Sequence, residues 1–395
     1  MITDEQIEKI LYKYTRRQDE FNLSVITLIA ERLSKLAGFD DLYTLNNSSV
    51  MIEDIAEMED YHKKFIKDQK KQLEDDFWWI AFVLYAEVIG FYETQIALQE
   101  NTELYNAILN SIDEAKVSLE ELLKNPVFVM RDLKNPAVSK SYSFKETYHS
   151  VMNEAFTYRN VSNTLRDIAL FRTESQLFDS GVRYLINNSS NKKQSVVSAN
   201  NAIRFNVLDS VKNLINKMQN IMGKQFGADG YELSAHVYPA PDHAPAQGHQ
   251  FTKEEVDKMQ SGEDFKDIDG NSYVGFVRNI GEWNCRHYFM QTKLGKKRTY
   301  TQEQLDKILE DNERGYTDEN GKHRTLYECT QVQRRYEREI RNSKQKYLYA
   351  KALNNKNMMA NARNRVGKLT TQYKQFSRKC DIPAKLERIT VKDYK

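Results

Sequence analysis

Apolar residues recur at helical spacing along most of the chain. Thr3 precedes three residues that favour a helix start, and apolar positions then repeat every three or four residues as far as Gly38. Similar stripes predict helices over residues 49–72, 77–92, 101–123, 144–178 and 195–222. Two Leu-Lys-Asn-Pro repeats predict a crossing loop over residues 125–143, because proline cannot continue a helix. The pattern predicts a mainly α fold.

One of these stretches, residues 77–92, is rich in aromatic residues. It spans 16 residues and contains Glu87, whereas a membrane-spanning helix needs about 20 predominantly apolar residues. We therefore expect a buried central helix and no membrane partner. Its aromatic side chains would also suit a contact with another protein.

The C-terminal part of the chain predicts a helical hairpin. Tyr336, Ile340 and Tyr347 lie near one face of a helix over residues 324–353, and a second stripe runs from Val366 to Phe376. An antiparallel pair would bury both stripes. The predicted organisation is thus a helical N-terminal domain over residues 1–180, a small central α+β segment over residues 181–295, and a basic helical hairpin over residues 296–395, so that long helical arms flank the central segment.

Charge is unevenly distributed between these parts. The chain has a net charge of +2, yet residues 322–395 hold 20 Lys and Arg against 6 Asp and Glu, a net charge of +14, which leaves −12 for the remainder. Arg334, Arg338 and Arg341 follow one another at i, i+4 and i+7, and Lys344 extends the same stripe. This pattern predicts a sequence-independent contact with double-stranded DNA. The alternative is docking onto an acidic protein surface, for which the chain's own body is a candidate.

The central segment holds the candidate chemistry. Two short stretches supply His236 with His243, and Cys285 with His287, and zinc prefers such nitrogen and sulfur ligands. Zinc is therefore the one cofactor that the sequence suggests. Three alternatives remain open: a polar network around a buried cysteine, a Cys–His nucleophile pair, and a ribonuclease-like use of histidine with Arg286.

Other residues of the same segment predict a rigid loop and its anchors. Gln247 and Gly248 can take positive φ after a proline-containing loop, and Trp283 beside Asn284 would anchor the second stretch in the core. The chain's cysteines are too few and too scattered for a disulfide framework, which fits assembly in a reducing cytoplasm.

Three motifs in this segment resemble the phage minor capsid protein 2 family and, more distantly, the Mu F-like head morphogenesis proteins. They are Ser234-Ala-His236, His243-Ala-Pro-Ala-Gln-Gly248 and Asn284-Cys-Arg-His287. The order and spacing match the family pattern, and the resemblance becomes weaker upstream and downstream. The run Val237-Tyr-Pro-Ala-Pro241 departs from the family, which commonly has an arginine before the loop proline. The resemblance therefore does not imply, for this chain, any activity of relatives that depends on this arginine.

The resemblance implies a structural minor capsid protein of a tailed bacteriophage. Such a protein is assembled in the host cytoplasm and incorporated in the virion, inside the head near the portal. Its implied partners are the portal protein and the capsid or scaffold proteins, and it would assist head morphogenesis, DNA packaging or delivery without being an enzyme. The alternative is a nuclease-like or toxin-like enzyme domain carried in the phage head.

Overall fold

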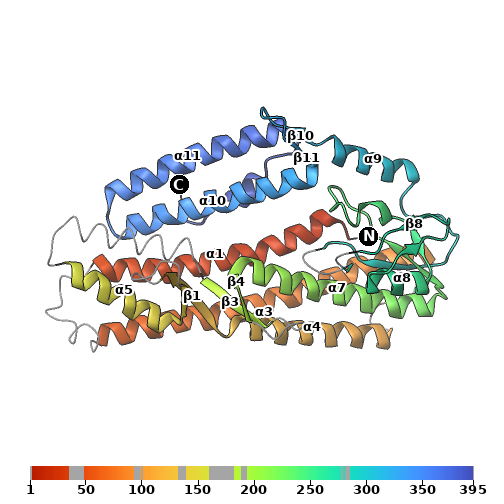
Figure 1. Ribbon diagram of the computed structural model, residues 1–395. Coiled ribbons are helices and arrows are strands. Elements are labelled where there is room, and N and C mark those ends of the chain that lie inside the picture. The colour runs from red at the N-terminus through yellow and green to blue at the C-terminus, as the bar shows by residue number, and fades with distance from the viewer. Residues whose placement is uncertain are drawn as a thin grey trace.

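The structure is a computed structural model that describes residues 2–34, 49–92, 98, 101–131, 139–159, 182–187, 194–276, 279–280 and 285–394. Long helices dominate these residues, and strands form only small sheets among them (Figure 1). The predicted mainly α fold, with helical arms and a small central α+β segment, is confirmed. None of the described helices combines the length and the apolar character that crossing a bilayer requires.

Four long helices form the main core. They are α1 (Asp4–Ser34), α3 (Ser49–Tyr92), α4 (Thr102–Leu123) and α7 (Ala199–Gln225). The helix start predicted at Thr3 is correct, because its hydroxyl accepts a hydrogen bond from the Gln6 backbone N–H at 3.2 Å. Apolar side chains such as Leu11, Leu119 and Leu208 are completely buried between the helices. α7 belongs to this core although its sequence lies in the predicted central segment.

The aromatic stretch of α3 is only partly buried. Phe77, Ile80 and Leu84 face the core, as predicted for a central helix, whereas Trp79 and Phe82 are exposed on the opposite side. α3 is therefore amphipathic here, and its outer face presents aromatic rings to the surroundings.

The loop predicted over residues 125–143 is wrong where the structure describes it. β1 (Pro126–Arg131) pairs antiparallel with β2 (Ser139–Tyr142). β3 (Val182–Asn187) and β4 (Gln194–Ser198) complete a sheet in the order β2–β1–β3–β4. Proline is tolerated at the first position of a strand, so the Leu-Lys-Asn-Pro repeat did not exclude β1. α5 (Phe144–Arg159) follows β2, and residues 160–178 of the predicted helix lie outside the described residues.

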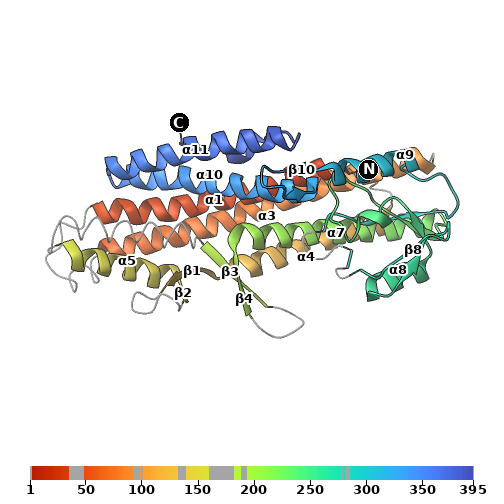
Figure 2. The same ribbon diagram turned by 45° about the horizontal axis from the view of Figure 1, so that its top comes forward.

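The C-terminal hairpin forms as predicted. α10 (Leu326–Ala352) and α11 (Lys356–Lys379) run antiparallel and bury Ile340 and Tyr373 between them (Figure 1). Thr325 begins α10 with a capping box. α10 lies against α1, and α11 forms the outer layer of the molecule (Figure 2). After α11 the chain returns along α10 through the short helix η4 (Leu386–Ile389).

The central segment packs at one end of the long helices (Figure 1). Its main sheet has the order β6–β5–β9. The remaining short elements connect this sheet to α10 and include a second strand pair, β7–β8, and a third, β10–β11. The bounds are β5 (Gly230–Leu233), β6 (Gln250–Phe251), α8 (Lys253–Ser261), β7 (Phe265–Lys266), β8 (Ser272–Tyr273), β9 (Phe289–Thr292), α9 (Gln302–Arg314), β10 (Tyr316–Thr317) and β11 (His323–Arg324).

The two strands predicted in this segment exist but are shorter than expected. The strand predicted over residues 231–238 ends at Leu233, and the one predicted over residues 273–277 is β8. Tyr238 has φ 56°, a left-handed conformation that cannot continue a strand. Residues 234–238 belong instead to the loop that carries the predicted site.

Candidate functional site

The central segment brings three of the four predicted zinc ligands together. The Sγ atom of Cys285 lies 3.4 Å from Nδ1 of His243 and 3.4 Å from Nδ1 of His287. All three side chains are buried, and their potential ligand atoms lie within 4.8 Å of one another. Cys285 and His287 immediately precede β9, whereas His243 ends the proline-containing loop before a short helix, η3 (Ala244–Ala246).

Gln247 and Gly248 hold this loop in place. Gly248 has φ 73°, as predicted, and its backbone N–H donates to the carbonyl oxygen of Leu233 at 2.7 Å. A Cβ atom at this glycine would lie 2.6 Å from the side chain of Leu305. The Oε1 atom of Gln247 accepts from the His236 backbone N–H at 3.2 Å and lies 3.3 Å from Nε2 of His287. The amide thus joins the two stretches that carry the predicted ligands.

The three side chains fit a tetrahedral zinc ion. Bonds of about 2.0 Å to nitrogen and about 2.3 Å to sulfur would separate two ligand atoms by about 3.5 Å. The outer imidazole nitrogens also have suitable neighbours: Nε2 of His287 faces the Gln247 oxygen, and Nε2 of His243 lies 3.6 Å from Oδ2 of Asp242. Zinc-binding histidines usually direct their second nitrogen to an oxygen of this kind.

His236 lies beside this cluster instead of within it. Its ring centroid is 4.3 Å from that of His287, but its Nδ1 atom lies 3.0 Å from the carbonyl oxygen of Val237. The geometry therefore supplies three ligands and leaves the fourth position to His236 or to water. Trp283 and Asn284, the predicted anchors, lie outside the described residues.

Burial keeps His236 and His287 neutral. Burial, helped by the positive charge of Arg286, lowers the pKa of His236 to about 3. Burial also lowers the pKa of His287 well below its usual value, and the neighbouring histidines add to this effect. A neutral imidazole is the form that binds a metal ion. It is a poor match for a general acid at neutral pH, which weakens the ribonuclease-like alternative.

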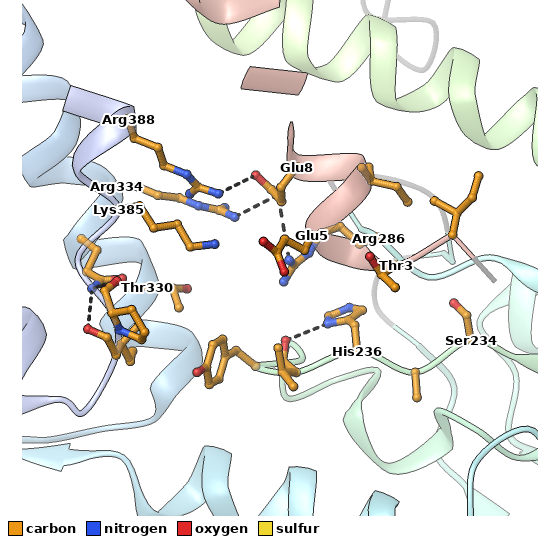
Figure 3. Close-up of a pocket in the computed structure, with 18 of the residues that line it drawn as sticks. Thr3, Glu5, Glu8, Ser234, His236, Arg286, Thr330, Arg334, Lys385 and Arg388 are labelled. Atoms are coloured by element: carbon orange, nitrogen blue, oxygen red, sulfur yellow. Dashed lines mark hydrogen bonds and ion pairs between the residues drawn. The ribbon is translucent and has the colours of Figure 1, made fainter. Parts of the chain in front are cut away.

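A buried carboxylate that the sequence did not single out lies next to the cluster. Glu8 of α1 is surrounded by four guanidinium groups, and Figure 3 shows three of them, those of Arg286, Arg334 and Arg388. The shortest distances from its carboxylate oxygens are 2.5 Å to Arg204, 3.3 Å to Arg334, 3.5 Å to Arg388 and 3.9 Å to Arg286. These arginines come from α7, α10, the η4 helix and the Cys285–His287 stretch. One carboxylate thus connects five segments of the chain.

The arginines determine the charge state of Glu8. Burial alone would raise the pKa of this carboxyl, but the positive charges of Arg204 and Arg334 outweigh it and hold the pKa well below its usual value. Burial and the neighbouring arginines in turn lower the pKa of Arg334 to about 10. The one sequence signal for this arrangement is that Glu8 falls beside Ile7 and Leu11 in the buried stripe of α1.

The four cations predicted to contact DNA differ in their surroundings, and the DNA contact itself stays a prediction. Arg334 pairs with Glu8, and Nε of Arg341 lies 2.9 Å from Oδ2 of Asp19. Nζ of Lys344 donates to the carbonyl oxygen of Ile389 at 2.7 Å. Arg338 is exposed. Two of the four side chains, Arg334 and Arg341, thus pair with carboxylates of α1.

A cavity of about 790 Å³ lies where α1, the central segment, α10 and the C-terminal residues meet. Figure 3 shows Arg334, Lys385 and Arg388 on one side of it and His236 and Ser234 on another, with Glu5 and Glu8 above. The cavity therefore lies between the arginine cluster and the loop that leads to the candidate zinc ligands.

Comparison with known proteins identifies the family. The sequence profile described as Phage minor capsid protein 2 matches residues 2–377 of the 395. The chain belongs to the phage minor capsid protein 2 family. The match includes the N-terminal helices, where the three motifs gave no information. No curated protein and no solved structure gives a match.

Membership of the phage minor capsid protein 2 family assigns the chain a structural role in a phage. A capsid protein is a component of the virion and interacts with other proteins of the phage head. The family also favours a role other than catalysis. In this context the buried Glu8 and the candidate zinc ligands are best tested first as features that stabilise a structural protein.

We expect Glu8→Gln to destabilise this minor capsid protein by about 3–5 kcal/mol at pH 7, because buried guanidinium groups would lose their shared counter-charge. Chemical denaturation of the full chain measures the loss. The stabilisation from a carboxyl with a depressed pKa is present above the ordinary pKa of 4.5 and is lost as the pH falls further. The difference between wild type and variant should therefore shrink below about pH 4.5.

The matched control is Glu5→Gln, one turn earlier on the same helix. Glu5 and its partner Lys9 are largely exposed, so this change should alter the unfolding free energy by no more than about 0.5 kcal/mol. Equal effects of the two substitutions would contradict the special role of Glu8.

We expect about one zinc ion per chain in protein purified without a metal-affinity tag, since the three ligands and a fourth group fill one tetrahedral site. Elemental analysis measures the content. Cys285→Ser and His287→Ala should lose the metal, and His236→Ala tests whether this residue is the fourth ligand. Cys329→Ser is the control, because Cys329 is a buried cysteine in a different cluster. Fully folded protein that contains no zinc and binds none on addition would exclude the site.

Proposed function

We propose that this protein is a non-enzymatic structural protein inside the head of a tailed phage, where it assists head assembly near the portal and contacts the packaged double-stranded DNA. The family match over nearly the whole chain carries the proposal. Two exposed surfaces support its finer parts. One is an aromatic surface on α3, suited to a protein partner, and the other is a cationic surface on α11, suited to DNA.

The aromatic surface consists of Trp78, Trp79 and Phe82 of α3 with Tyr105 of α4. The ring centroid of Trp78 lies 5.4 Å from that of Tyr105 and 6.3 Å from that of Phe82. Trp79 is 40% exposed and Phe82 is 55% exposed. Exposed tryptophan and phenylalanine are enriched at protein interfaces, where a few aromatic residues supply much of the binding free energy. This surface is the proposed contact with the portal or a neighbouring head protein.

The cationic surface consists of seven exposed side chains of α11, a helix that contains no Asp or Glu. They are Lys356, Arg363, Arg365, Lys368, Lys374, Arg378 and Lys379. Only Arg365 and Lys379 among them lie in ion pairs found between described residues, with Glu339 and Glu319, and both remain more than half exposed. Binding to the phosphate backbone requires such a series of cations and no base-reading motif. The proposed DNA contact thus moves from the inner face of α10 to the outer face of α11.

A nuclease-like or toxin-like enzyme is the alternative, and it has less support. His243 and His287 lie around the buried thiol of Cys285, an arrangement that suits metal binding. A structural family also argues for a protein that acts through its surfaces.

We expect Trp79→Ala together with Phe82→Ala to reduce incorporation into procapsids by about tenfold or more, because truncating central aromatic residues of an interface often costs 2 kcal/mol or more. Incorporation is measured by quantifying the protein in procapsids assembled with each variant. Point changes are preferable to deleting the first 122 residues, since that deletion would also remove Glu8.

Ile52→Ala is the matched control for the aromatic surface. Ile52 also lies on α3 and is 66% exposed, but it is far along the helix from Trp79. It should leave incorporation unchanged. Normal incorporation of the double variant, with its fold intact, would show that recruitment uses another surface.

We expect the full chain to bind duplex DNA of unrelated sequences with similar affinity, and the affinity to fall steeply with salt. Changing Lys368, Lys374 and Arg378 to Gln should reduce the log–log salt slope by up to about 2.7, at roughly 0.9 for each phosphate that the variant no longer neutralises. Electrophoretic mobility shifts at several salt concentrations measure this slope.

Three exposed lysines of α3 provide the matched control for the cationic surface. Changing Lys63, Lys64 and Lys67 to Gln removes the same charge from a different surface and should leave the slope unchanged. Absence of any shift at low salt, or equal slopes for the α11 variant and wild type, would rule out α11 as the DNA contact.

A further inference from the structure

The cavity beside Glu8 has the size and the lining of a ligand site. Its volume of about 790 Å³ falls within the roughly 300–1,000 Å³ of typical small-molecule pockets. Its lining comes from six separate parts of the chain, namely the start of α1, the loop after β5, the stretch before β9, the residues before α9, α10 and the C-terminal residues. A cavity at such a junction keeps its shape only while these parts stay packed together.

Positive charge predominates around this cavity. Four cationic side chains and three carboxylates line the cavity, which gives an excess of one positive charge, and a fifth cation, Arg204, pairs with one of these carboxylates. The lining cations are Arg286, Arg334, Lys385 and Arg388, and the carboxylates are Glu5, Glu8 and Glu337. Arg204 contacts Glu8 but does not line the cavity, whereas the other seven side chains do. An excess of cations in a partly enclosed site attracts anions strongly, because solvent screens the charges less than at an open surface.

The cations reach the cavity from different segments of the chain, with Arg334 and Lys385 on one side and Arg286 apart from them, beside Glu5 (Figure 3). Arg334 comes from α10, Arg286 from the stretch before β9, and Lys385 from the segment after α11 (Figure 3). A tetrahedral phosphate has several oxygens that can accept hydrogen bonds from donors on different sides. A planar carboxylate ligand would need fewer donors. The arginines also already bind one carboxylate, that of Glu8.

The remaining wall of the cavity is less polar. Tyr238, Ile382 and Pro383 lie there, and Tyr300 and Thr330 add hydroxyl groups. The volume far exceeds what inorganic phosphate alone would occupy. This wall leaves room for an organic group attached to the phosphate, and an aromatic ring such as that of Tyr238 is a suitable surface for a nucleobase.

We propose that this cavity binds the phosphate group of a nucleotide-sized ligand, with the phosphate between Arg286, Arg334 and Lys385 and the less polar part of the ligand against Tyr238 and Pro383. A free nucleotide and the phosphorylated end of a nucleic-acid strand share this chemistry. The cavity is formed by a single chain, so the inference does not depend on the proposed surfaces of α3 and α11 or on assembly into a head.

Isothermal titration calorimetry of the purified full chain tests the inference. We expect adenosine monophosphate to bind and adenosine to bind at least about tenfold more weakly, since a hydrogen bond to a charged group contributes about 1.5–3 kcal/mol. Lys385→Gln should weaken the binding of adenosine monophosphate by about tenfold or more for the same reason. This residue is chosen because, unlike Arg334 and Arg388, it makes no ion pair with Glu8.

Two further variants keep the test decisive even if Lys385→Gln folds poorly. Glu5→Gln removes an exposed negative charge at the cavity and should tighten binding by about two- to fivefold. Lys64→Gln removes an exposed charge from the distant middle of α3 and should change nothing. The inference is overturned if neither adenosine monophosphate nor inorganic phosphate binds, or if binding is insensitive to both Lys385→Gln and Glu5→Gln.

Competition experiments distinguish the two sources of the phosphate. A short single-stranded oligonucleotide with a 5′-phosphate should displace adenosine monophosphate, and the same oligonucleotide with a 5′-hydroxyl should not, if the cavity receives a strand end. Failure of both oligonucleotides to displace it assigns the cavity to free nucleotides. Equal displacement by both would show that the backbone and not a terminal phosphate is bound, which would contradict the proposed binding mode.

Discussion

The carboxylate of Glu8 ties α1 to four other segments of this protein. Four arginines from α7, the Cys285–His287 stretch, α10 and the η4 helix converge on it. Each guanidinium group would be costly to bury alone, and each one repels the other three, so they are compatible only with a shared negative charge among them. A buried ion pair is weak evidence for stability in itself. Here the ion pairs determine the position of α1 relative to α10, because sliding or rotating α1 would separate Glu8 from Arg334.

The contacts of Glu8 also link the candidate zinc site to the cavity. Arg286 contacts Glu8 and lies in the sequence between Cys285 and His287, so the position of α1 influences the stretch that carries two candidate zinc ligands. His236 lies on the other side, where Gln247 accepts from its backbone N–H and approaches His287. The loop, the Cys285–His287 stretch and the first turns of α1 therefore form one connected unit. A change in any of them should be transmitted to the cavity that they line.

Periodicity predicted the parts of this fold that depend on local pattern. The long helices, the cap at Thr3, the hairpin of α10 and α11 and the positive φ of Gly248 follow from hydrophobic spacing and from the conformational preferences of single residues. The pair β1–β2 was missed because of the proline at position 126. A proline ends the preceding helix, but either a loop or a strand can follow it. Glu8 was missed because its partners are far away in sequence. Three of the predicted zinc ligands converge, whereas the distance of His236 from the cluster depends on a backbone turn that spacing alone does not specify.

The net charge of a segment is also an incomplete guide to what the segment contacts. The positive C-terminal part and the negative remainder of the chain suggested an external polyanion, but part of that asymmetry is satisfied internally, because Arg334 and Arg341 of α10 pair with Glu8 and Asp19 of α1. A net charge counts residues without regard to the face on which they lie. α11 differs from α10 because it contains no acidic residue and forms the outer layer, so its cations remain at the surface. The cations that can meet an external anion are those whose charge is not already paired inside the molecule. In this hairpin α10 gives Arg334 and Arg341 to carboxylates of α1, whereas the cations of α11 face outward, and even Arg365 and Lys379, which pair with Glu339 and Glu319, stay more than half exposed.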